Sequence, residues 1–334
     1  METAVRVLQT QIQLAVDALR SGQLISFPTE TVYGLGADAA NASAVRRIFE
    51  LKGRPSSHPL IVHVAQRGAL REWAAKVSPV AEKLAEAFWP GPLTLVLPRA
   101  ASVLDAVTGG QDSIAIRIPS HPIAQDLLSA FGGGIAAPSA NRFGRLSATR
   151  AEHVREEFGD AVKVILDGGP CAVGLESTIV SCLDEIPRLL RPGAVTLAQL
   201  QAVAGTVRVG GGHDAPRVPG STVSHYAPST PLSIVANDEL DRLTQSLARS
   251  GQRVAVLAQR APSKVDATVT WINAGTQASA YAHDLYANLR ALDHAGCALI
   301  LVQDVPGDPS WDAIRDRLQR AAAAHPSLPM AVSS

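Results

Sequence analysis

The residues best suited to chemistry near the start of the chain lie in one stretch, residues 26–38. It contains the carboxylate of Glu30, the hydroxyl of Thr31 and those of other side chains, together with two glycines. The apolar run 24–27 predicts a strand, and Pro28 cannot donate to a sheet ladder, so the chain is expected to leave the sheet there. The glycines permit close backbone approach to a ligand. An ordinary turn and a ligand-binding loop both fit this pattern.

Arg117 is the second candidate, because of what shares its side of a predicted strand over residues 113–118. Alternation along a strand places three isoleucines on one face and Ser113, Ala115 and Arg117 on the other. Since only small side chains accompany it, the guanidinium has room to bind a carboxylate or phosphate. An arginine that reaches solvent or pairs with a structural carboxylate also fits.

Further hydroxyl and basic side chains lie at or near the ends of predicted elements. They are Lys52, Arg54, His58, His63, Ser139, Ser147, Ser177 and Arg191. Taken singly, each is more often a surface residue, and Ser147 would also serve as a helix cap. Together they form a set without an evident nucleophile, which suits the binding and orientation of anions and a reaction driven by proximity and charge stabilisation.

Several common chemistries are absent from the sequence. There is no G-x-x-x-x-G-K-[ST] motif and no H-E-x-x-H motif, and Ser139 does not stand in G-x-S-x-G. The run Gly34 to Ala39 resembles a dinucleotide fingerprint, but Pro28 and polar residues separate it from its strand, and no acid follows at the required distance. We therefore treat that match as accidental.

The surrounding segments predict α/β alternation over the first two thirds of the chain. The predicted helices are 5–19, 43–51, 78–90 and 149–158, with Ser78 and Thr149 as N-caps, and the predicted strands include 60–64, 93–97, 113–118 and 162–166. These elements place most of the polar candidates at strand ends.

The character of the sequence changes near Gly205. Residues 206–230 contain a triple glycine and several prolines, which are typical of a linker between a domain at 1–205 and a second one at 231–334. The second domain predicts a small parallel, Rossmann-like sheet with a helix capped by Asn237. Within the linker, Tyr226 fits either a pin against a domain surface or a lid over a site.

Composition and charge exclude several protein classes. The chain has 334 residues, 46% of them hydrophobic, and a formal net charge of zero, so no whole-chain field attracts nucleic acid or a membrane. Its three cysteines form no C-x-x-C pair, which argues against a disulfide framework and a zinc site and favours the reducing cytoplasm. No signal sequence and no apolar run of about 20 residues is present.

Five motifs together resemble the YrdC family over residues 10–205. They are Pro28-Thr29-Glu30-Thr31-Val32-Tyr33-Gly34-Leu35-Gly36, Lys52-Gly53-Arg54-Pro55, Ser113-Ile114-Ala115-Ile116-Arg117-Ile118-Pro119, Ala137-Pro138-Ser139-Ala140-Asn141 and Glu176-Ser177-Thr178-Ile179-Val180. The tetrapeptide 225–228 and the trailing α/β segment resemble the long, two-domain form of that family. A related hydrogenase-maturation carbamoyltransferase is discounted, because its C-x-x-C pairs and acylphosphatase-like segment are missing.

The resemblance implies a twisted open sheet with flanking helices, followed by a smaller Rossmann-like domain. It also implies a nucleotidyltransferase that converts L-threonine, bicarbonate and ATP into threonylcarbamoyl-adenylate and pyrophosphate. Magnesium is expected on the ATP phosphates, with no metal site of the protein's own. The product would supply a downstream transferase that modifies tRNA beside the anticodon, and direct contact with tRNA is a further expectation.

The resemblance also assigns roles to individual residues. Thr31, His63, Arg117, the Ala137 backbone and Ser177 would hold threonine. The nucleotide would be held by Arg54, His58, Ser113, Ser139, Ser147, Arg191 and Tyr226, with Lys52 facing the phosphates and acting with Arg54 in catalysis.

Two departures from the family pattern stand out. His58 occupies a position where asparagine is expected, so this contact would either differ in geometry or respond to pH near the usual imidazole pKa of about 6.5. Residues 221–224 replace the basic residues that often precede the His225-Tyr226 pair. A non-catalytic RNA-binding module and a nucleotide-binding regulator therefore remain as alternatives; salt-dependent RNA binding without threonine-dependent pyrophosphate release would favour the former.

Overall fold

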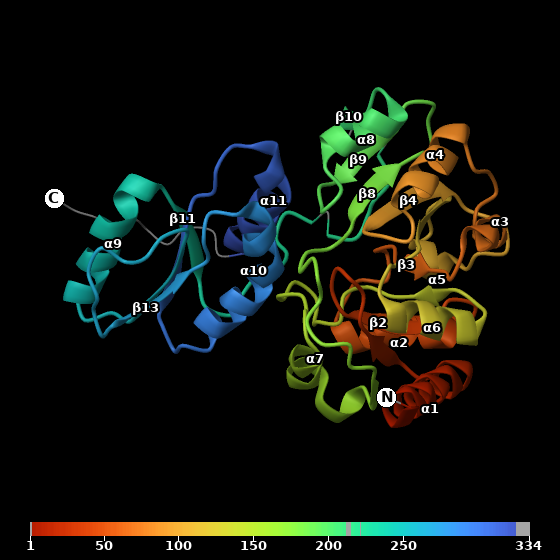
Figure 1. Cartoon of the computed structure of the whole chain (residues 1–334), viewed down its shortest axis with the longest axis horizontal. Coiled ribbons are helices and arrows are strands. Elements are labelled where there is room, and N and C mark those ends of the chain that lie inside the picture. Colours follow the sequence, from red (N-terminus) through yellow and green to blue (C-terminus); the bar gives the residue numbers. More distant parts are fainter. Residues whose placement is uncertain (1, 212–214, 221, 325–334) are drawn as a thin grey trace. The chain divides into compact units, whose positions relative to one another are not determined.

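The computed structural model describes residues 2–211, 215–220 and 222–324 (Figure 1). The chain divides into two compact units, the first made of Met1–Phe143 and Ser147–Ser221 and the second of Gly144–Leu146 and Thr222–Ser334. The division after residue 221 falls inside the predicted linker. The assignment of residues 144–146 to the second unit has no counterpart in the sequence-based prediction.

A ten-stranded mixed sheet forms the first unit, in the order β10-β9-β8-β4-β5-β3-β6-β2-β1-β7. The strands are β1 (Ile25–Phe27), β2 (Gly34–Asp38), β3 (Ile61–His63), β4 (Leu93–Pro98), β5 (Ser113–Arg117), β6 (Ile135–Ala136), β7 (Val164–Ile165), β8 (Thr178–Ser181), β9 (Arg188–Arg191) and β10 (Arg208–Val209). The sheet ladder leaves β1 at Phe27, immediately before Pro28, as predicted. Residues 28–33 therefore connect two antiparallel strands.

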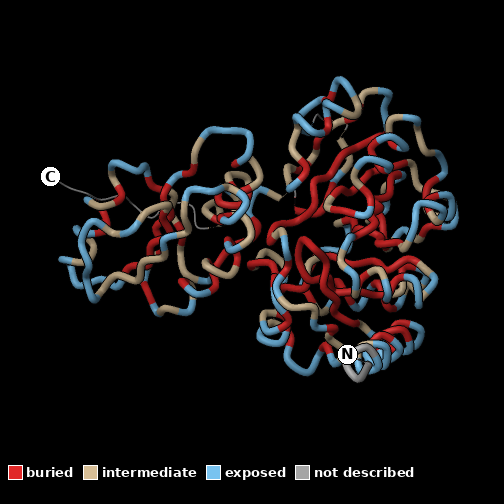
Figure 2. The backbone as a smooth tube through the Cα atoms, in the orientation of Figure 1, coloured by how far each residue is buried: buried red, intermediate tan, exposed pale blue. Residues whose placement is uncertain are grey.

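Helices cover this sheet and close its core. They are α1 (Glu2–Arg20), α2 (Ala42–Lys52), α3 (Leu70–Trp73), α4 (Pro79–Phe88), α5 (Asp105–Thr108), α6 (Pro122–Phe131), α7 (Ala151–Phe158) and α8 (Leu197–Ala204), with 3-10 turns at Arg67–Ala69 and Gly159–Ala161. In Figure 2 the strands are buried along most of their length, whereas α1 shows an exposed outer side. The alternation predicted for residues 113–118 is confirmed, because Ile114, Ile116 and Ile118 lie in the main apolar core and Ala115 in a separate one.

Local sequence signals explain where two of these helices begin and end. Asn41 caps α2 by accepting from the backbone N–H groups of residues 43 and 44, and Gly53 ends it with φ 63°, a left-handed conformation that favours glycine. Ser78 caps α4 as predicted. The predicted cap at Thr149 is wrong, because α7 begins two residues later and the Thr149 backbone N–H donates to His153 Nδ1.

The second unit is built on a four-stranded parallel sheet in the order β11-β14-β12-β13, which confirms the Rossmann-like prediction. Its strands are β11 (Leu232–Val235), β12 (Val254–Ala258), β13 (Val269–Asn273) and β14 (Leu299–Gln303). Its helices are α9 (Asn237–Arg249), α10 (Ala278–Asp293) and α11 (Asp312–Ala322), with a 3-10 turn at Pro309–Trp311. Helix α9 lies on one side of the sheet and α10 and α11 on the other (Figure 1).

The predicted cap at Asn237 is also wrong. Asn237 is the first residue of α9, and Ala236 holds the cap position without a side-chain bond. The Asn237 side chain instead accepts a hydrogen bond from Gln303 Nε2 at 3.0 Å. Within the described residues, no helix is long and apolar enough to cross a membrane.

Candidate active site

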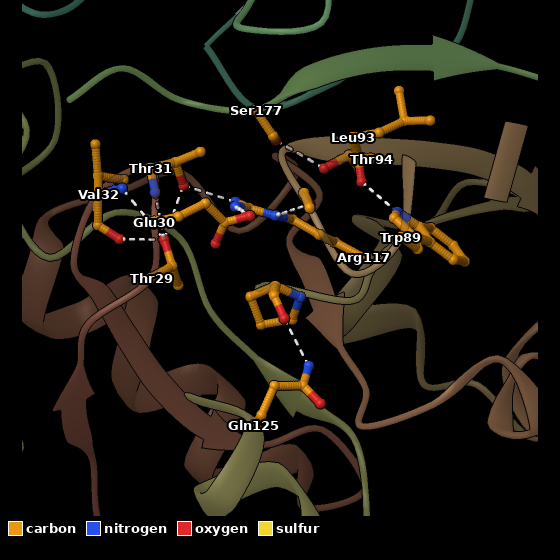
Figure 3. A network of polar contacts seen from close by, with 12 residues as sticks. Thr29, Glu30, Thr31, Val32, Trp89, Leu93, Thr94, Arg117, Gln125 and Ser177 are labelled. Carbon is orange, nitrogen blue, oxygen red and sulfur yellow. Dashed lines mark hydrogen bonds and ion pairs between the residues drawn. The ribbon is translucent and has the colours of Figure 1, made fainter. Parts of the chain in front are cut away.

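Arg117 is held by three different groups at the end of β5 (Figure 3). Its terminal nitrogens reach the Glu30 carboxylate at 2.9 Å and Thr31 Oγ1 at 2.7 Å, and its Nε donates to the Gly91 carbonyl at 3.2 Å. Arg117 thus donates two hydrogen bonds, from Nε and NH1, while its NH2 meets Glu30 as an ion pair without hydrogen-bond geometry. Both partners of the ion pair are buried, with side-chain exposures of 4% for Arg117 and 8% for Glu30.

Glycine is needed at position 91 for this arrangement. A Cβ there would stand 2.4 Å from the Phe88 carbonyl oxygen, closer than nonbonded atoms approach. The Gly91 N–H donates to the Ile118 carbonyl at 2.8 Å, which fixes the loop beside β5. The loop therefore presents its carbonyl to Arg117 without a side chain in the way.

Ser177 joins Arg117 through the neighbouring strand. Thr94 of β4 is the register partner of Arg117, so their side chains lie on the same face, and Thr94 Oγ1 lies 2.7 Å from Ser177 Oγ. Arg191 donates to the carbonyl and hydroxyl oxygens of Ser177, at 2.9 Å and 3.2 Å. We call Glu30, Thr31, Thr94, Arg117 and Ser177 the Arg117 cluster.

His63 lies on the other side of Arg117. It ends β3 and is the register partner of Arg117 in the parallel pair β3/β5, and its ring meets that of Phe27 edge to face at 5.8 Å. Burial, together with the positive charge of Arg117, lowers the pKa of His63 from 6.5 to about 3. His63 is therefore neutral at physiological pH and able to accept a hydrogen bond.

A second group forms around Lys52, at the end of α2. The buried Lys52 ammonium donates to the main-chain carbonyls of Ser139, at 2.6 Å, and Asn141. This differs from our expectation that Lys52 faces phosphates, because the carbonyls of the 139–141 turn occupy it. Burial, reinforced by the charge of Arg54 and opposed by that of Glu157, holds the pKa of Lys52 well below its usual value.

Arg54 and His58 complete this second group. The Arg54 guanidinium lies over the Phe143 ring at 5.8 Å and donates to the Pro59 carbonyl, and the His58 ring meets Phe143 edge to face at 5.4 Å. Partial burial and the charges of Arg54 and Arg217 lower the pKa of His58. Its response to pH is therefore expected below, and not at, the ordinary imidazole range. We call Lys52, Arg54, His58, Ser139 and Phe143 the Lys52 cluster.

One set of contacts connects the two clusters, and another joins Ser147 to the residue before Ser177. The loop that carries Thr31 lies against the 138–140 segment, since Ala140 N–H donates to the Tyr33 carbonyl at 2.8 Å and Leu35 N–H to the Pro138 carbonyl at 2.9 Å. On the other side, Ser147 Oγ donates to Glu176, the residue before Ser177. Ser147 and Arg191 thus both contact residues 176–177.

Ser113 and Ala137 are placed by their strands. Ser113 begins β5, at the opposite end from Arg117, and no hydrogen bond among the described residues joins its side chain to either cluster. Ala137 follows β6, and its N–H donates to the Ile61 carbonyl at 2.9 Å. The backbone of Ala137 can therefore offer a ligand its carbonyl, while its N–H is already engaged.

Tyr226 belongs to the second unit. It is buried, its ring lies 5.9 Å from that of Tyr286, and the Arg317 guanidinium lies over it at 5.2 Å. Its φ of 61° is a left-handed conformation that a tyrosine seldom adopts. In this structure Tyr226 thus packs against α10 and α11.

Comparison with known proteins agrees with this geometry. The family model for Sua5, YciO and YrdC proteins, described as telomere recombination, matches residues 17–193, and the model for the threonylcarbamoyl-AMP synthase C-terminal domain matches residues 195–323. The threonylcarbamoyl-AMP synthase of Bacillus subtilis is 41% identical, with 93% of each chain covered. That of Pyrococcus abyssi is 38% identical, with 95% of each covered. The chain belongs to the threonylcarbamoyl-AMP synthase family.

A solved structure from this family matches the fold as well. The crystal structure of P. abyssi Sua5 complexed with L-threonine superposes with a TM-score of 0.87 at 39% identity, covering 93% of this chain and 94% of that one. The chain, as a member of this family, is an enzyme of the nucleotidyltransferase class.

The sequence alone did not point to four residues of the site described above. Glu30 was named in the first stretch but was given no role, because its pairing with Arg117 arises only when the loop after β1 meets the end of β5. Thr94 lies in an apolar strand and Phe143 in an unassigned loop, and neither position carries a distinguishing pattern. Glu176 precedes a predicted site residue and was not singled out.

A metal site is a separate question for this enzyme family. Among residues 2–211, 215–220 and 222–324, no group of three or more histidine, cysteine, aspartate or glutamate side chains is arranged to hold a metal ion.

Proposed function

We propose that this chain condenses L-threonine, bicarbonate and ATP into threonylcarbamoyl-AMP and pyrophosphate. The observation that carries the proposal is the fixed position of Arg117 between Glu30, Thr31 and the Gly91 carbonyl, with Ser177 beside it. A buried guanidinium in a preoriented plane suits an amino-acid carboxylate. The P. abyssi relative that was crystallised with L-threonine supports threonine as this ligand.

The proposed reaction has two steps. Bicarbonate takes up a proton and loses water to give carbon dioxide, and the threonine amine attacks its carbon and releases a proton as the carbamate forms. A carbamate oxygen then attacks the α-phosphorus of ATP while pyrophosphate leaves from the opposite side. Every intermediate is anionic, so the positive groups of both clusters act by stabilising negative charge as it moves.

On the threonine side, His63 and Ala137 would act as acceptors. Neutral His63 is suited to accept a hydrogen bond from the threonine amine or hydroxyl, and the Ala137 carbonyl can accept another. Thr31 and Ser177 would donate to the carboxylate. Orienting the amine toward the incoming carbon is a contribution of proximity, for which no nucleophilic side chain is needed.

On the nucleotide side, Arg54 and His58 would contact ATP next to Phe143. Lys52 would position the turn that carries Ser139 and add positive charge next to that turn. Ser113, Ser147, Arg191 and Tyr226 complete the proposed ATP contacts, and Tyr226 would have to leave its packing against Tyr286 to act as a lid. Magnesium would be bound through the ATP phosphates.

The product would be passed to a transferase that modifies tRNA next to the anticodon. Family membership supports this step, and direct contact with tRNA is part of the same proposal. The three cysteines, all of them unpaired, are consistent with a reaction in the reducing cytoplasm.

Pyrophosphate release tests the proposal directly. The protein is incubated with ATP, magnesium, bicarbonate and threonine, and each component is omitted in turn. Pyrophosphate is expected only from the complete mixture. Release without threonine, or ATP binding without any turnover, would overturn the proposal in favour of a nucleotide-binding regulator.

A further inference from the structure

The three residues 144–146 lie between two segments of the first unit but make their contacts in the second. Ala227 N–H donates to the Gly144 carbonyl at 2.8 Å, and Arg145 pairs with Ala227 as a short parallel bridge. The 144–146 segment is thus joined to the stretch that directly follows Tyr226. We call residues 227–230 the strap.

Arg290 of α10 is hydrogen-bonded to this segment. It is 8% exposed, and its NH2 donates to the Leu146 carbonyl at 2.6 Å. A buried charged donor on a backbone carbonyl is among the stronger hydrogen bonds in proteins. Because Ser147 is the next residue after Leu146, this bond fixes the point from which Ser147 extends.

Asp293, the last residue of α10, binds both segments with one carboxylate. It accepts from the N–H groups of Ser229, at 2.9 Å, and Thr230, at 2.7 Å, and it pairs with Arg145 NH2 at 3.4 Å. Burial alone would raise the pKa of Asp293, but the two backbone N–H donors and Arg145 lower it overall. The carboxylate therefore stays ionised in the neutral range and joins the strap to the 144–146 segment.

We propose that Arg290 and Asp293 are positioning residues for ATP binding. They hold the 144–146 segment, which leads into Ser147, against the strap, which directly follows Tyr226. The inference rests on the proposed function, because it takes these two residues as ATP contacts. It gives two residues of α10 a specific task, which is to fix the backbone next to two proposed ATP contacts before ATP arrives.

The physical basis is preorganisation. We call the bonds that Arg290 and Asp293 make to residues 144–146 and to the strap the clamp. Without the clamp, the free-energy cost of ordering both segments would reduce the affinity for ATP. With the clamp, both segments are already ordered in the folded protein. The proposed threonine contacts arise from the loop after β1, from β3 and β5, from the residue after β6 and from the loop before β8, and none of these belongs to residues 144–146 or to the strap. The clamp should therefore affect ATP more than threonine.

The test compares Arg290→Met, Arg290→Lys and Asp293→Asn with a matched control, Arg253→Met. Arg253 is exposed and also donates to a backbone carbonyl of the second unit, that of Ala295 at 2.9 Å, but it does not touch the 144–146 segment. MgATP affinity is measured by calorimetry without threonine, and the KM values for ATP and threonine are taken from pyrophosphate release.

Arg290→Met is expected to weaken MgATP binding about tenfold, the loss of one charge-assisted hydrogen bond. Asp293→Asn should weaken it about threefold, and Arg290→Lys should recover most of the loss because lysine still donates to the Leu146 carbonyl. The KM for threonine should stay within about twofold, and Arg253→Met should leave both constants unchanged.

Unchanged MgATP affinity in both Arg290→Met and Asp293→Asn would overturn the inference, as would equal losses for ATP and threonine. If Arg290→Met fails to fold, Arg145→Ala removes the clamp from its more exposed side, and unchanged MgATP affinity there has the same meaning. Wild-type protein that binds MgATP but releases no pyrophosphate with threonine would refute the proposed function alone, since the calorimetric comparison stands without catalysis.

Discussion

The Arg117 cluster and the Lys52 cluster bury a cation in different ways. Arg117 faces a carboxylate, Glu30, and a hydroxyl, so its charge is balanced and its plane is fixed by side chains. Lys52 is directed to two main-chain carbonyls, and burial, reinforced by the charge of the nearby Arg54, lowers its pKa. The first arrangement fixes an orientation, and the second fixes a turn of the backbone.

This difference suits different ligands. A carboxylate needs a guanidinium in one defined plane, and Glu30 supplies that constraint. A triphosphate carries more charge than one residue can balance, and it benefits from a site with excess positive potential. The two clusters therefore predict separable effects on threonine and ATP.

Arg117→Ala should produce the largest effect. It removes the proposed carboxylate anchor and leaves Glu30 as a buried unpaired charge, which should lower the free energy of unfolding by about 3 to 5 kcal/mol. The KM for threonine should rise about a hundredfold, far more than that for ATP. Pyrophosphate kinetics and urea unfolding measure both.

The matched control for this change is Arg46→Ala, an exposed arginine of α2. The double variant Arg117→Met with Glu30→Gln should recover stability without recovering threonine affinity. Equal losses for threonine and ATP would contradict the division into two clusters.

His63 gives a pH test of the Arg117 cluster. Its folded pKa of about 3 lies below the ordinary 6.5, so between these values the unfolded chain takes up a proton that the folded chain does not. Stability should be complete above pH 6.5 and fall as the pH falls, with a slope approaching about 1.4 kcal/mol per pH unit. Urea unfolding of wild type and His63→Gln from pH 7 to pH 4 measures how the free energy of unfolding depends on pH in each. Equal pH dependence in the two proteins would contradict the prediction.

Glu30→Gln should sharpen the contrast without removing the cation. Glutamine keeps the size of the side chain but loses the charge that orients Arg117, so the KM for threonine should rise about tenfold, the value of one charge-assisted contact. ATP affinity should change little. Glu50→Gln, an exposed carboxylate of α2, is the control.

Lys52→Met should affect the opposite ligand. Loss of the ammonium frees the 139–141 turn, and the KM for ATP should rise about fivefold to tenfold while threonine is affected less. Lys83→Met, on the exposed side of α4, serves as control. A larger change for threonine than for ATP would remove the basis for treating Lys52 as part of the nucleotide side.

His58→Asn should have the smallest effect. Because the pKa of His58 is lowered, the imidazole gains its charge only below the ordinary range, where it would strengthen ATP binding. Wild-type KM for ATP is therefore expected to fall about twofold on acidification, and the asparagine variant should lack this response. Initial rates at several pH values decide the point.

How far the sequence predicts these clusters depends on the distance between the partners. The alternation around Arg117 was readable because it depends on neighbours within one strand, and the turn at Gly53 because it is local. The pairing of Glu30 with Arg117 was not readable, since it arises when the loop after β1 meets the end of β5. The mistaken caps at Thr149 and Asn237 have a related cause. Thr149 bonds to the His153 side chain and Asn237 to the Gln303 side chain, where the prediction expected the first backbone N–H groups of a helix.

The boundaries of the domains show the same limit. A linker is visible as a change in composition, and the division after residue 221 falls within it. The transfer of residues 144–146 to the second unit leaves no compositional trace, because it depends on Arg290 and Asp293, far along the chain.

That transfer has a consequence for dissecting the protein. A protease cut anywhere in 206–221 yields an N-terminal fragment that still contains the 144–146 segment, which is bonded to Ala227, Arg290 and Asp293 of the C-terminal fragment. The nicked chain should therefore elute as one species under native conditions and separate only in denaturant. Expressing the first 205 residues alone would remove the support of an internal loop as well as a terminal domain.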